Sequence, residues 1–424
     1  MPDDAHGKPV GELLAAVCDR RVVAGLAPRA TVPRRVLILT AAVGDGHLST
    51  ASALAAELTA FDSSLEVIVA DALHDLGRVL RVLLLDLYRW QLDRAPWVFG
   101  LLYHAFRRLP PLRLVGQRGL AVIAGRSVLR AITDTRPDVV VSTYPAMTAV
   151  IGGLRASHRL KIPAVAAISD LAGVEFWAHR GIDLHLVMHP GCVAAVERVA
   201  GSGSALCVRP LVRPGFYAQE PQAEARRSLG FDADTPLVLV SGGGWGVGAL
   251  EAATQTALAT REDARIICLA GRDPSRESQL RVAFKGIERV NVLGFTEMMP
   301  PLLAAADVLI HTTGGVTCLE AQAAGCPVIA FGGPPGHSRL LAREMARLGI
   351  AVEARTIGDL ADALRLLAQS PRSGSAERAQ ASAVTSILGI EARDQPKVNQ
   401  LRRSVVALSV AASIVIAIGA LHPI

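Results

Sequence analysis

The residues of this chain that are best suited to chemistry lie in glycine-rich turns that follow predicted strands. Residues 40–47 have the sequence TAAVGDGH, and a helix is predicted to begin at once. Glycines allow a tight turn, and the free N–H groups at a helix start bind an anion or oxyanion. His47 is a candidate general base, since the ordinary pKa of histidine is about 6.5. A helix cap is the simpler role for this histidine, and residues 44–49 with Asp71 also fit a dinucleotide-binding turn.

Two further turns of this kind occur in the second half of the chain. Residues 241–248, SGGGWGVG, also follow a predicted strand, and their N–H groups can surround a phosphate. They lack the Lys-Ser/Thr pair of a P-loop, which argues against nucleotide hydrolysis. Residues 311–321, HTTGGVTCLEA, combine a Thr/Gly turn with Glu320, which could accept hydrogen bonds from a ribose diol. Glu320 fits equally well as a capping-box carboxylate that reaches back to Thr317.

Two blocks of alternating strands and helices must position these turns, a pattern typical of parallel sheets covered by helices. The fold class is therefore α/β, with two Rossmann-like, doubly wound domains that face each other across a cleft. His47 would project into this cleft at the carboxyl edge of the first sheet. The predicted strands are residues 35–39, 65–70, 138–142, 163–168 and 183–187 in the first block, and 237–241, 265–269, 289–293, 308–311, 328–331 and 350–352 in the second.

Changes in composition predict the domain boundaries. Residues 1–208 form the N-terminal domain and residues 237–369 the C-terminal domain, joined by the proline-rich linker 209–236. Residues 370–403, rich in Ser, Ala, Arg and Gln, are predicted to be a spacer. Residues 404–421 contain no charged side chain and would form a helix of about 27 Å, close to the thickness of a bilayer core.

This uncharged C-terminal segment is predicted to be a transmembrane anchor. Arg402 and Arg403 precede it, so the positive-inside rule places the domains on the cytoplasmic face of the membrane. The N-terminal residues 1–21 are acidic in part and contain no apolar core of a signal peptide. The alternative is a buried C-terminal helix that packs on the protein, although such a helix usually keeps a polar stripe.

Residues 75–130 are too many for one crossover helix and form a predicted insertion. They contain ten Arg and three Asp beside an apolar, Trp-bearing face. This pattern suits a helix in an anionic membrane surface, while the alternative is an ordinary insertion with a solvated Arg face. No recognition motif accompanies the charge, so no nucleic-acid partner is expected. The candidate acceptor and membrane residues are Arg81, Trp90, Trp97, Arg107 and Arg108.

Composition excludes several other classes of protein. With 424 residues, 51% of them hydrophobic and 19% charged, the chain is neither disordered nor a small module. Its six cysteines are far apart and lack metal-ligand spacing, so neither a disulfide framework nor a zinc site is expected. Asp232 and Asp234 are predicted to lie in a solvated turn of the linker, and no metal is expected.

Six segments together resemble glycosyltransferase family 28, of the GT-B fold. The branch they resemble is that of the diacylglycerol glycosyltransferases, which includes monogalactosyldiacylglycerol synthase and the processive bacterial glucosyl enzymes. The resemblance implies inverting, metal-free transfer of a sugar from a UDP donor to a lipid acceptor, without a cofactor. The segments are TAAVGDGHLSTASALAAEL (40–58), DVVVSTYP (138–145), ISDLAGVEFWAHRGIDLHLV (168–187), PLVRPGF (210–216), LVSGGGWGVG (239–248) and LGFTEMMPPLLAAADVLIHTTGGVTCLEAQAAGCPVIAF (293–331).

The resemblance also implies roles for individual residues. His47 would deprotonate the acceptor hydroxyl, with Asp170 near it in the cleft. Glu320 would bind the ribose hydroxyls, and the segment at Phe295 and Thr296 would face uracil. The insertion 75–130 would meet the membrane and the lipid acceptor. The remaining donor-binding residues implied are Arg213, Gly243, Gly244, Trp245, Gly314, Gly315 and His337, with Arg213 and Gly243–Trp245 at the diphosphate.

Three departures from the family pattern leave alternatives open, and one of them is the predicted C-terminal span at residues 404–421. Asp45 stands where relatives often have Gly or another small residue. Gly336-His337-Ser338 replaces a Gly-Gln-Glu-like run that contacts the donor sugar, so the donor sugar stays open. The alternatives to a glycosyltransferase are a UDP-sugar 2-epimerase, an NAD(P)-dependent oxidoreductase that uses Asp71, and an inactive membrane-bound relative that binds a nucleotide sugar.

Overall fold

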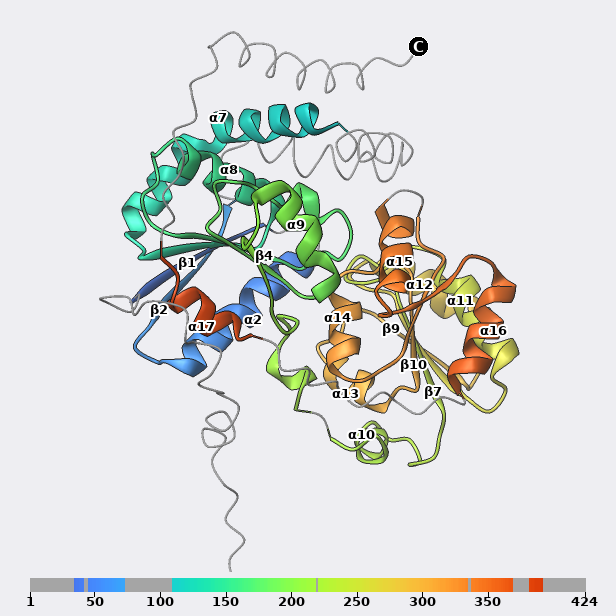
Figure 1. Ribbon diagram of the computed structural model, residues 1–424. Helices are drawn as coiled ribbons and strands as arrows, with labels where there is room; N and C mark the ends of the chain where they lie inside the picture. The colour runs from blue at the N-terminus through green and yellow to red at the C-terminus, as the bar shows by residue number, and fades with distance from the viewer. Residues whose placement is uncertain are drawn as a thin grey trace, which may run out of the picture.

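The computed structural model describes residues 34–41, 45–72, 109–218, 220–334, 337–368 and 381–391. Within them, two domains are each built on a six-stranded parallel sheet. Figure 1 shows the N-terminal domain, coloured from blue to green, beside the C-terminal domain, coloured from yellow to orange. The predicted pair of Rossmann-like sheets is confirmed.

The N-terminal sheet has the strand order β2-β1-β3-β4-β5-β6. Its inner strands are short apolar runs with both faces buried, as expected of a parallel sheet between helices. The short edge strand β6 is not predicted by the sequence. The bounds are β1 Arg35–Thr40, β2 Glu66–Asp71, β3 Val139–Ser142, β4 Ala164–Ile168, β5 Leu184–Val187 and β6 Ala205–Cys207, with α2 Gly46–Phe61, α7 Pro110–Thr135, α8 Pro145–Ala156, α9 Val193–Ala200 and the short 3₁₀ helices η2 Val174–Phe176 and η3 Pro190–Cys192.

The C-terminal sheet has the strand order β12-β11-β10-β7-β8-β9. Its predicted strands agree with the structure to within two residues at each end. The bounds are β7 Leu237–Ser241, β8 Arg265–Leu269, β9 Val290–Leu293, β10 Val308–His311, β11 Val328–Phe331 and β12 Val352–Ala354, with α11 Leu250–Thr260, α12 Pro274–Ala283, α13 Met299–Ala305, α14 Val316–Ala323, α15 His337–Arg347 and α16 Ile357–Ala368.

Each sheet has one point at which the strand order reverses. In the first sheet, β1 lies between β2 and β3, and in the second, β7 lies between β8 and β10. Ligands of open α/β sheets bind in the crevice that such a reversal leaves at the carboxyl ends of the strands. The turn with His47 follows β1, and the turns at 242–248 and 312–315 follow β7 and β10. All three predicted turns therefore lie at a reversal point.

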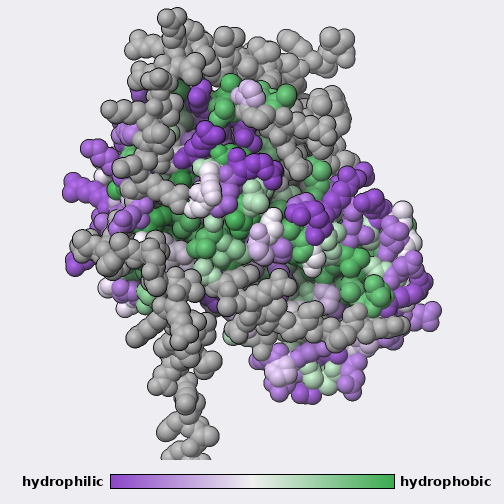
Figure 2. Space-filling view, viewed as in Figure 1, coloured by the Kyte–Doolittle hydropathy of each residue, from purple (hydrophilic) through white to green (hydrophobic). Residues whose placement is uncertain are grey.

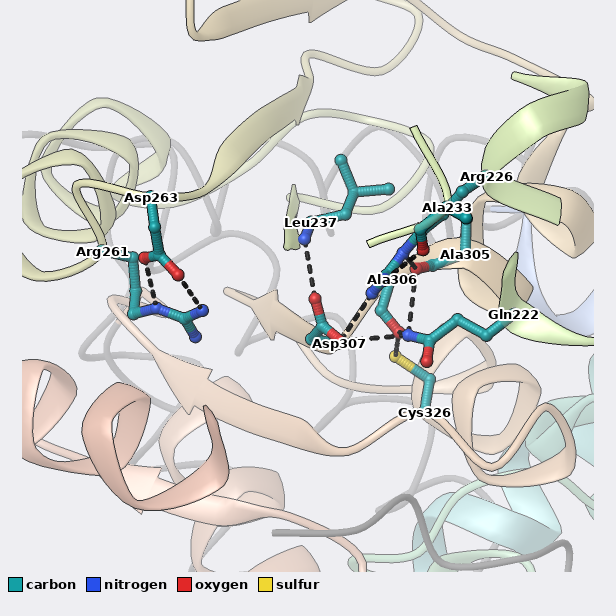
Figure 3. Close-up of polar contacts among 10 residues, drawn as sticks. All are labelled: Gln222, Arg226, Ala233, Leu237, Arg261, Asp263, Ala305, Ala306, Asp307 and Cys326. Atoms are coloured by element: carbon teal, nitrogen blue, oxygen red, sulfur yellow. Dashed lines mark hydrogen bonds and ion pairs between the residues drawn. The ribbon is translucent and has the colours of Figure 1, made fainter. Parts of the chain in front are cut away.

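The linker 209–236 contains the 3₁₀ helix η4 (Pro214–Phe216) and α10 (Gln222–Ser228). Figure 3 shows how α10 is fixed to the C-terminal sheet through Asp307. Asp307 accepts hydrogen bonds from Arg226 Nη2 at 2.7 Å, Gln222 Nε2 at 3.0 Å and the backbone N–H of Leu237 at 2.7 Å. The second half of the linker is thus a part of the C-terminal domain.

A helix from the far end of the chain packs on the N-terminal domain. Residues 370–403 are predicted to be a spacer, but α17 (Ala383–Leu388) lies within them and contacts α2. Figure 1 shows α17, in red-orange, beside the blue α2. Its buried side chains, Ala383, Val384, Ile387 and Leu388, join the core of that domain. The isolated bridge between Val208 and Ala381 adds a second attachment.

The predicted membrane segments lie largely outside the described residues. Residues 404–421 and the candidate residues Arg81, Trp90, Trp97, Arg107 and Arg108 all fall there. The described end of the insertion forms α7, whose exposed side chains are partly apolar. No helix within the described part of the chain is both long enough and apolar enough to cross a bilayer.

Candidate active site

His47 lies in the first turn of α2, at the carboxyl edge of the N-terminal sheet. Its ring meets Tyr144 edge-on with 5.1 Å between ring centroids, and the ring of Trp177 lies 5.6 Å away. The hydroxyl of Thr143 donates to the carbonyl oxygen of His47 at 3.2 Å. Tyr144 follows β3 and Trp177 follows β4, so segments after three neighbouring strands hold the imidazole.

Asp170 is joined to this group through Trp177. The indole Nε1–H donates to Asp170 Oδ2 at 2.9 Å, and Trp177 is almost completely buried. Asp170 is therefore linked to His47 through the indole, which it holds beside the imidazole. Sequence reasoning missed Tyr144 and Trp177 as parts of the site, although both lie in segments that carry the family resemblance.

Two turns of the C-terminal domain form one cradle. Ser241 pairs with His311 in register across β7 and β10, so the turns that follow these strands start side by side. Thr312 Oγ1 donates a hydrogen bond to the carbonyl oxygen of Val247 and thereby ties the turns together. Gly248 has a φ of +102°, and a Cβ there would collide with Thr312, so this close approach requires glycine.

His311 lies beneath this cradle and was not predicted to have a role of its own. It is buried, and its Nδ1 accepts from the backbone N–H of Thr313 at 3.2 Å and of Gly314 at 2.7 Å. In the neutral ring Nε2 must then carry the hydrogen, and it has no hydrogen-bond partner among the described residues. Burial lowers the pKa of His311 to about 4, so the ring is neutral near pH 7. A Cβ on Gly243 would lie 4.0 Å from His311 Cε1, which places the ring against the cradle.

Glu320 is buried in α14, one turn after Gly314 and Gly315. Burial raises its pKa from 4.5 to about 7, and the nearby charge of Arg213 partly opposes that rise. The predicted ribose ligand and the predicted diphosphate ligand therefore share one electrostatic environment. A Cβ on Gly315 would meet nothing within 4 Å among the described residues, so they leave space for a ligand at the start of α14.

The segment predicted to face uracil is accessible. Phe295 is 45% exposed, and the guanidinium carbon of Arg272 lies 3.3 Å from the centroid of its ring. Thr296 Oγ1 accepts from the backbone N–H of Met298 at 3.1 Å, which shapes the turn before α13. Trp245 is half-buried in the glycine turn. His337 begins α15, and its side chain is outside what the structure describes.

The two halves of the site touch. Asp45, two residues before His47, accepts a hydrogen bond from Arg272 Nε at 3.3 Å across the domain boundary. A Cβ on Gly46 would lie 3.2 Å from Val316 Cγ2 at the start of α14. The turn that carries the imidazole thus faces the cradle directly. Within the described ranges, no three His, Cys, Asp or Glu side chains gather as metal ligands.

Two family models match successive parts of the chain. Residues 47–200 match the family described as "Monogalactosyldiacylglycerol (MGDG) synthase". Residues 246–370 match the family described as "Glycosyl transferases group 1". The first range contains His47 and the aromatic residues around it, and the second contains the turn at 312–315 and Glu320.

Similar proteins span most of this chain. It is 27% identical over 328 residues to monogalactosyldiacylglycerol synthase 1, chloroplastic, of Arabidopsis thaliana, which covers 71% of this chain and 58% of the relative. It is 22% identical over 339 residues to the processive diacylglycerol beta-glucosyltransferase of Bacillus pumilus (strain SAFR-032), which covers 79% of this chain and 87% of the relative. The chain therefore spans little more than half the length of the plant relative.

Among solved structures, the crystal structure of TcCGT1 in complex with UDP is similar over 81% of this chain and 92% of that chain. The TM-score is 0.50 and the sequence identity 13%. At this identity the likeness supports the fold alone, which is the two-domain GT-B arrangement.

Proposed function

We propose that this chain transfers a hexosyl group from a UDP-sugar to a membrane lipid such as diacylglycerol, because it is similar to the monogalactosyldiacylglycerol synthases and the processive diacylglycerol glucosyltransferases. One observation carries this proposal beyond the resemblance. The turn with His47 and the phosphate cradle lie at the reversal points of their sheets and touch through Asp45 and Arg272.

On this proposal His47 acts as the general base of an inverting displacement. It takes the proton of the acceptor hydroxyl while that oxygen forms a bond to the anomeric carbon. The bond between the anomeric carbon and the diphosphate oxygen breaks, and UDP leaves with the electron pair. Tyr144 and Trp177 pack against the imidazole and limit its rotation, and Asp170 acts through Trp177 as a positioning residue.

The leaving UDP would be stabilised by groups in and near the cradle that the resemblance predicts. Backbone N–H groups of Gly243–Trp245 and the start of α14 offer positive ends of dipoles, and Arg213 adds a full charge. Uracil would lie at Phe295 and Thr296, and the ribose hydroxyls at Glu320. The resemblance predicts that no metal takes part, and a donor set of this kind supplies the charge stabilisation that the step needs.

The experiment that tests the function is product formation in vesicles that contain diacylglycerol. UDP-galactose, UDP-glucose and UDP-N-acetylglucosamine are supplied in turn to the wild type, His47→Ala and the control His158→Asn, which changes an exposed histidine. We expect one donor to give a new glycolipid with the wild type and the control, and at least ~100-fold less with His47→Ala, the usual size of a lost general base. Similar UDP affinities would show that all three proteins are folded.

Other outcomes would contradict particular parts of the proposal. Wild-type rates in His47→Ala would remove this residue from the role of base. Conversion of the UDP-sugar without an acceptor would favour the epimerase. Binding of UDP with no turnover for any donor would favour an inactive relative.

We further propose that the enzyme acts at the cytoplasmic face of the cell membrane. The sequence supports an anchor at residues 404–421 and a peripheral surface at 75–130, which would bind anionic lipid. The described part of that surface is α7, where Leu114, Val122 and Ile123 are exposed beside several Arg side chains. Figure 2 shows hydrophobic and hydrophilic residues mixed over this part of the molecule, at the top of the view.

Truncation before Ser404 separates the two proposed contacts. We expect the truncated chain to leave neutral vesicles but to stay partly bound to anionic ones at low salt, because the Arg-rich surface remains. Sedimentation with vesicles of both compositions measures this, since surface electrostatics weaken as salt rises. Complete release from anionic vesicles at low salt would contradict the peripheral surface, and retention on neutral vesicles would contradict the anchor.

A further inference from the structure

We propose that Arg272 is a donor-binding residue and that Asp45 competes with the diphosphate of the donor for it. This inference rests on the proposed function, because it concerns how a UDP-sugar enters the site. Neither residue was assigned a role in binding the donor. Three features support it: the backbone position of Arg272, the exposed amino groups of its guanidinium, and the position of the Asp45 carboxylate.

The backbone at Arg272 is built into the phosphate cradle. Its N–H donates to the carbonyl oxygen of Gly244 at 2.8 Å. Gly271, with a φ of +75°, approaches the same turn so closely that a Cβ would lie 2.6 Å from the amide nitrogen of Gly246. The position from which the Arg272 side chain starts is therefore fixed relative to the N–H groups that would bind phosphate.

The guanidinium of Arg272 is held on one side and open on the other. Phe295 lies under it at 3.3 Å, and Nε–H donates to Asp45 at 3.3 Å. Neither terminal amino group of Arg272 has a hydrogen-bond partner among the described residues, and the side chain is 55% exposed. An arginine at a phosphate site with both amino groups open is suited to bidentate recognition of phosphate oxygens.

The Asp45 carboxylate lies where it opposes an anionic ligand. A Cβ on Gly244 would collide with Asp45 Oδ2, so the carboxylate rests directly against the cradle. A diphosphate at the N–H groups of Gly243–Trp245 would bring two negative groups together there. Like charges in contact repel, and Arg272 can serve as the partner of only one of them at full strength. Donor binding must therefore loosen the bond between Asp45 and Arg272.

This exchange would link donor binding to the catalytic turn. Asp45 is two residues before His47, so the turn with the base is tied to the donor domain only while the diphosphate is absent. When the donor arrives, Arg272 moves its charge from the carboxylate to the phosphates. The turn with His47 can then change its position to fit the hydroxyl of the lipid acceptor. The position of Asp45 thus lowers the affinity of the site for the donor. It also makes the turn with His47 respond to donor binding.

The test is a double-mutant cycle measured by calorimetric titration of UDP at pH 8 and low salt. It compares the full-length wild type, Asp45→Asn, Arg272→Gln and the double variant. We expect Asp45→Asn to bind UDP up to ~5-fold more tightly, which is the range of exposed ion pairs. Arg272→Gln should bind at least ~10-fold more weakly, as expected for lost charged hydrogen bonds. When Arg272 is already replaced by glutamine, adding Asp45→Asn should increase the affinity for UDP only slightly.

Controls separate this exchange from general effects of charge. Asp362→Asn breaks an exposed pair with Arg365 on the surface and should leave UDP affinity unchanged. Uridine, which lacks phosphates, should bind Asp45→Asn and the wild type equally. Arg272→Lys keeps the charge but loses the planar fork, and should fall between the wild type and Arg272→Gln.

Unchanged or weaker UDP binding by Asp45→Asn would overturn the inference. The inference would also be overturned if Asp45→Asn increased UDP affinity equally with and without Arg272, because Asp45 would then act on the diphosphate by repulsion alone. A folded wild type that binds no UDP would instead refute the proposed function. Retained wild-type affinity in both Arg272 variants would remove Arg272 from the donor site and leave the proposed function standing.

Discussion

Replacing Glu320 by glutamine should abolish a pH dependence of donor affinity. Glu320 is 8% exposed, and burial raises its pKa to about 7. As a carboxylate it can accept two hydrogen bonds from the ribose hydroxyls, whereas the protonated acid has lost part of that capacity. If the ionised form alone binds the ribose well, the apparent dissociation constant must rise as Glu320 is protonated.

The size of this effect follows from the position of the pKa. At pH 8.5 Glu320 is almost fully ionised, and at pH 5.5 only about 3% of it is, given a pKa of about 7. A ligand that requires the carboxylate would therefore bind about 30-fold more weakly at pH 5.5 than at pH 8.5. The neutral amide of Glu320→Gln does not titrate, so its donor affinity should be lower at pH 8.5 and nearly independent of pH.

UDP-glucose is the suitable probe for this titration, in the absence of acceptor. Its diphosphate has no proton that titrates in this range, whereas the terminal phosphate of UDP titrates near pH 6. Calorimetry from pH 5.5 to 8.5 would compare the wild type, Glu320→Gln and the control Glu262→Gln, which changes an exposed glutamate. A flat wild-type profile, or the same slope in Glu320→Gln, would refute the role of the carboxylate.

The pH dependence of the free energy of unfolding gives an independent measure of the raised pKa of Glu320. The pKa of Glu320 is higher in the folded state than in the unfolded state, so folding is favoured by its protonated form. This contribution is complete below pH 4.5 and is lost as the pH rises through about 7, by about 3 kcal/mol in total. Glu320→Gln should lack that loss in urea unfolding, which measures the carboxyl group without any ligand.

Two further predictions concern stability. Asp307→Ala should lower the free energy of unfolding in urea by about 3–5 kcal/mol, because it leaves the buried Arg226 without its carboxylate, while the exposed control Asp362→Ala should cost under about 0.5 kcal/mol. Equal losses would show that the network in Figure 3 does not fix the linker. His179 and His311 have pKa values of about 4, lowered from 6.5 chiefly by burial, so their neutral forms favour folding above pH 6.5 and that stability is lost as the pH falls toward 4. His311→Asn should reduce the loss of unfolding free energy between pH 6.5 and pH 4 by about 3 kcal/mol. If the stability of this variant falls over that range as much as that of the wild type, the buried neutral ring is contradicted.

The predictable part of the fold is the part set by local sequence. Buried parallel strands are short apolar runs that end in turn residues, so their positions could be predicted without knowledge of their neighbours. Two helices could not be predicted in this way. α10 and α17 lie in stretches with the composition of a linker, and each is stabilised by partners distant in sequence, Asp307 for α10 and α2 for α17.

The same division applies to the candidate site. His47, Gly314 and Glu320 follow strands in turns of recognisable composition, so local sequence pointed to them. Trp177 and Arg272 gave no such signal, because their place depends on tertiary neighbours. Trp177 meets His47 because β3 and β4 follow β1 in the sheet, and Arg272 meets Asp45 because the two domains are in contact. Neither of these two contacts can be predicted from the order of residues along the chain.

The position of Arg213 connects the linker with the donor site. The chain leaves the N-terminal domain after Val208, which pairs with Ala381, and the linker is fixed to the C-terminal domain from α10 onward. Between them, η4 contacts α13 and α14, and Arg213 precedes η4. Arg213, whose charge partly offsets the rise in the pKa of Glu320, therefore comes from the segment that joins the two domains. Because η4 packs on α13 and α14, Arg213 is held beside Glu320 by the packing of the linker on the C-terminal domain, so the predicted donor site depends on the linker as well as on its own turns.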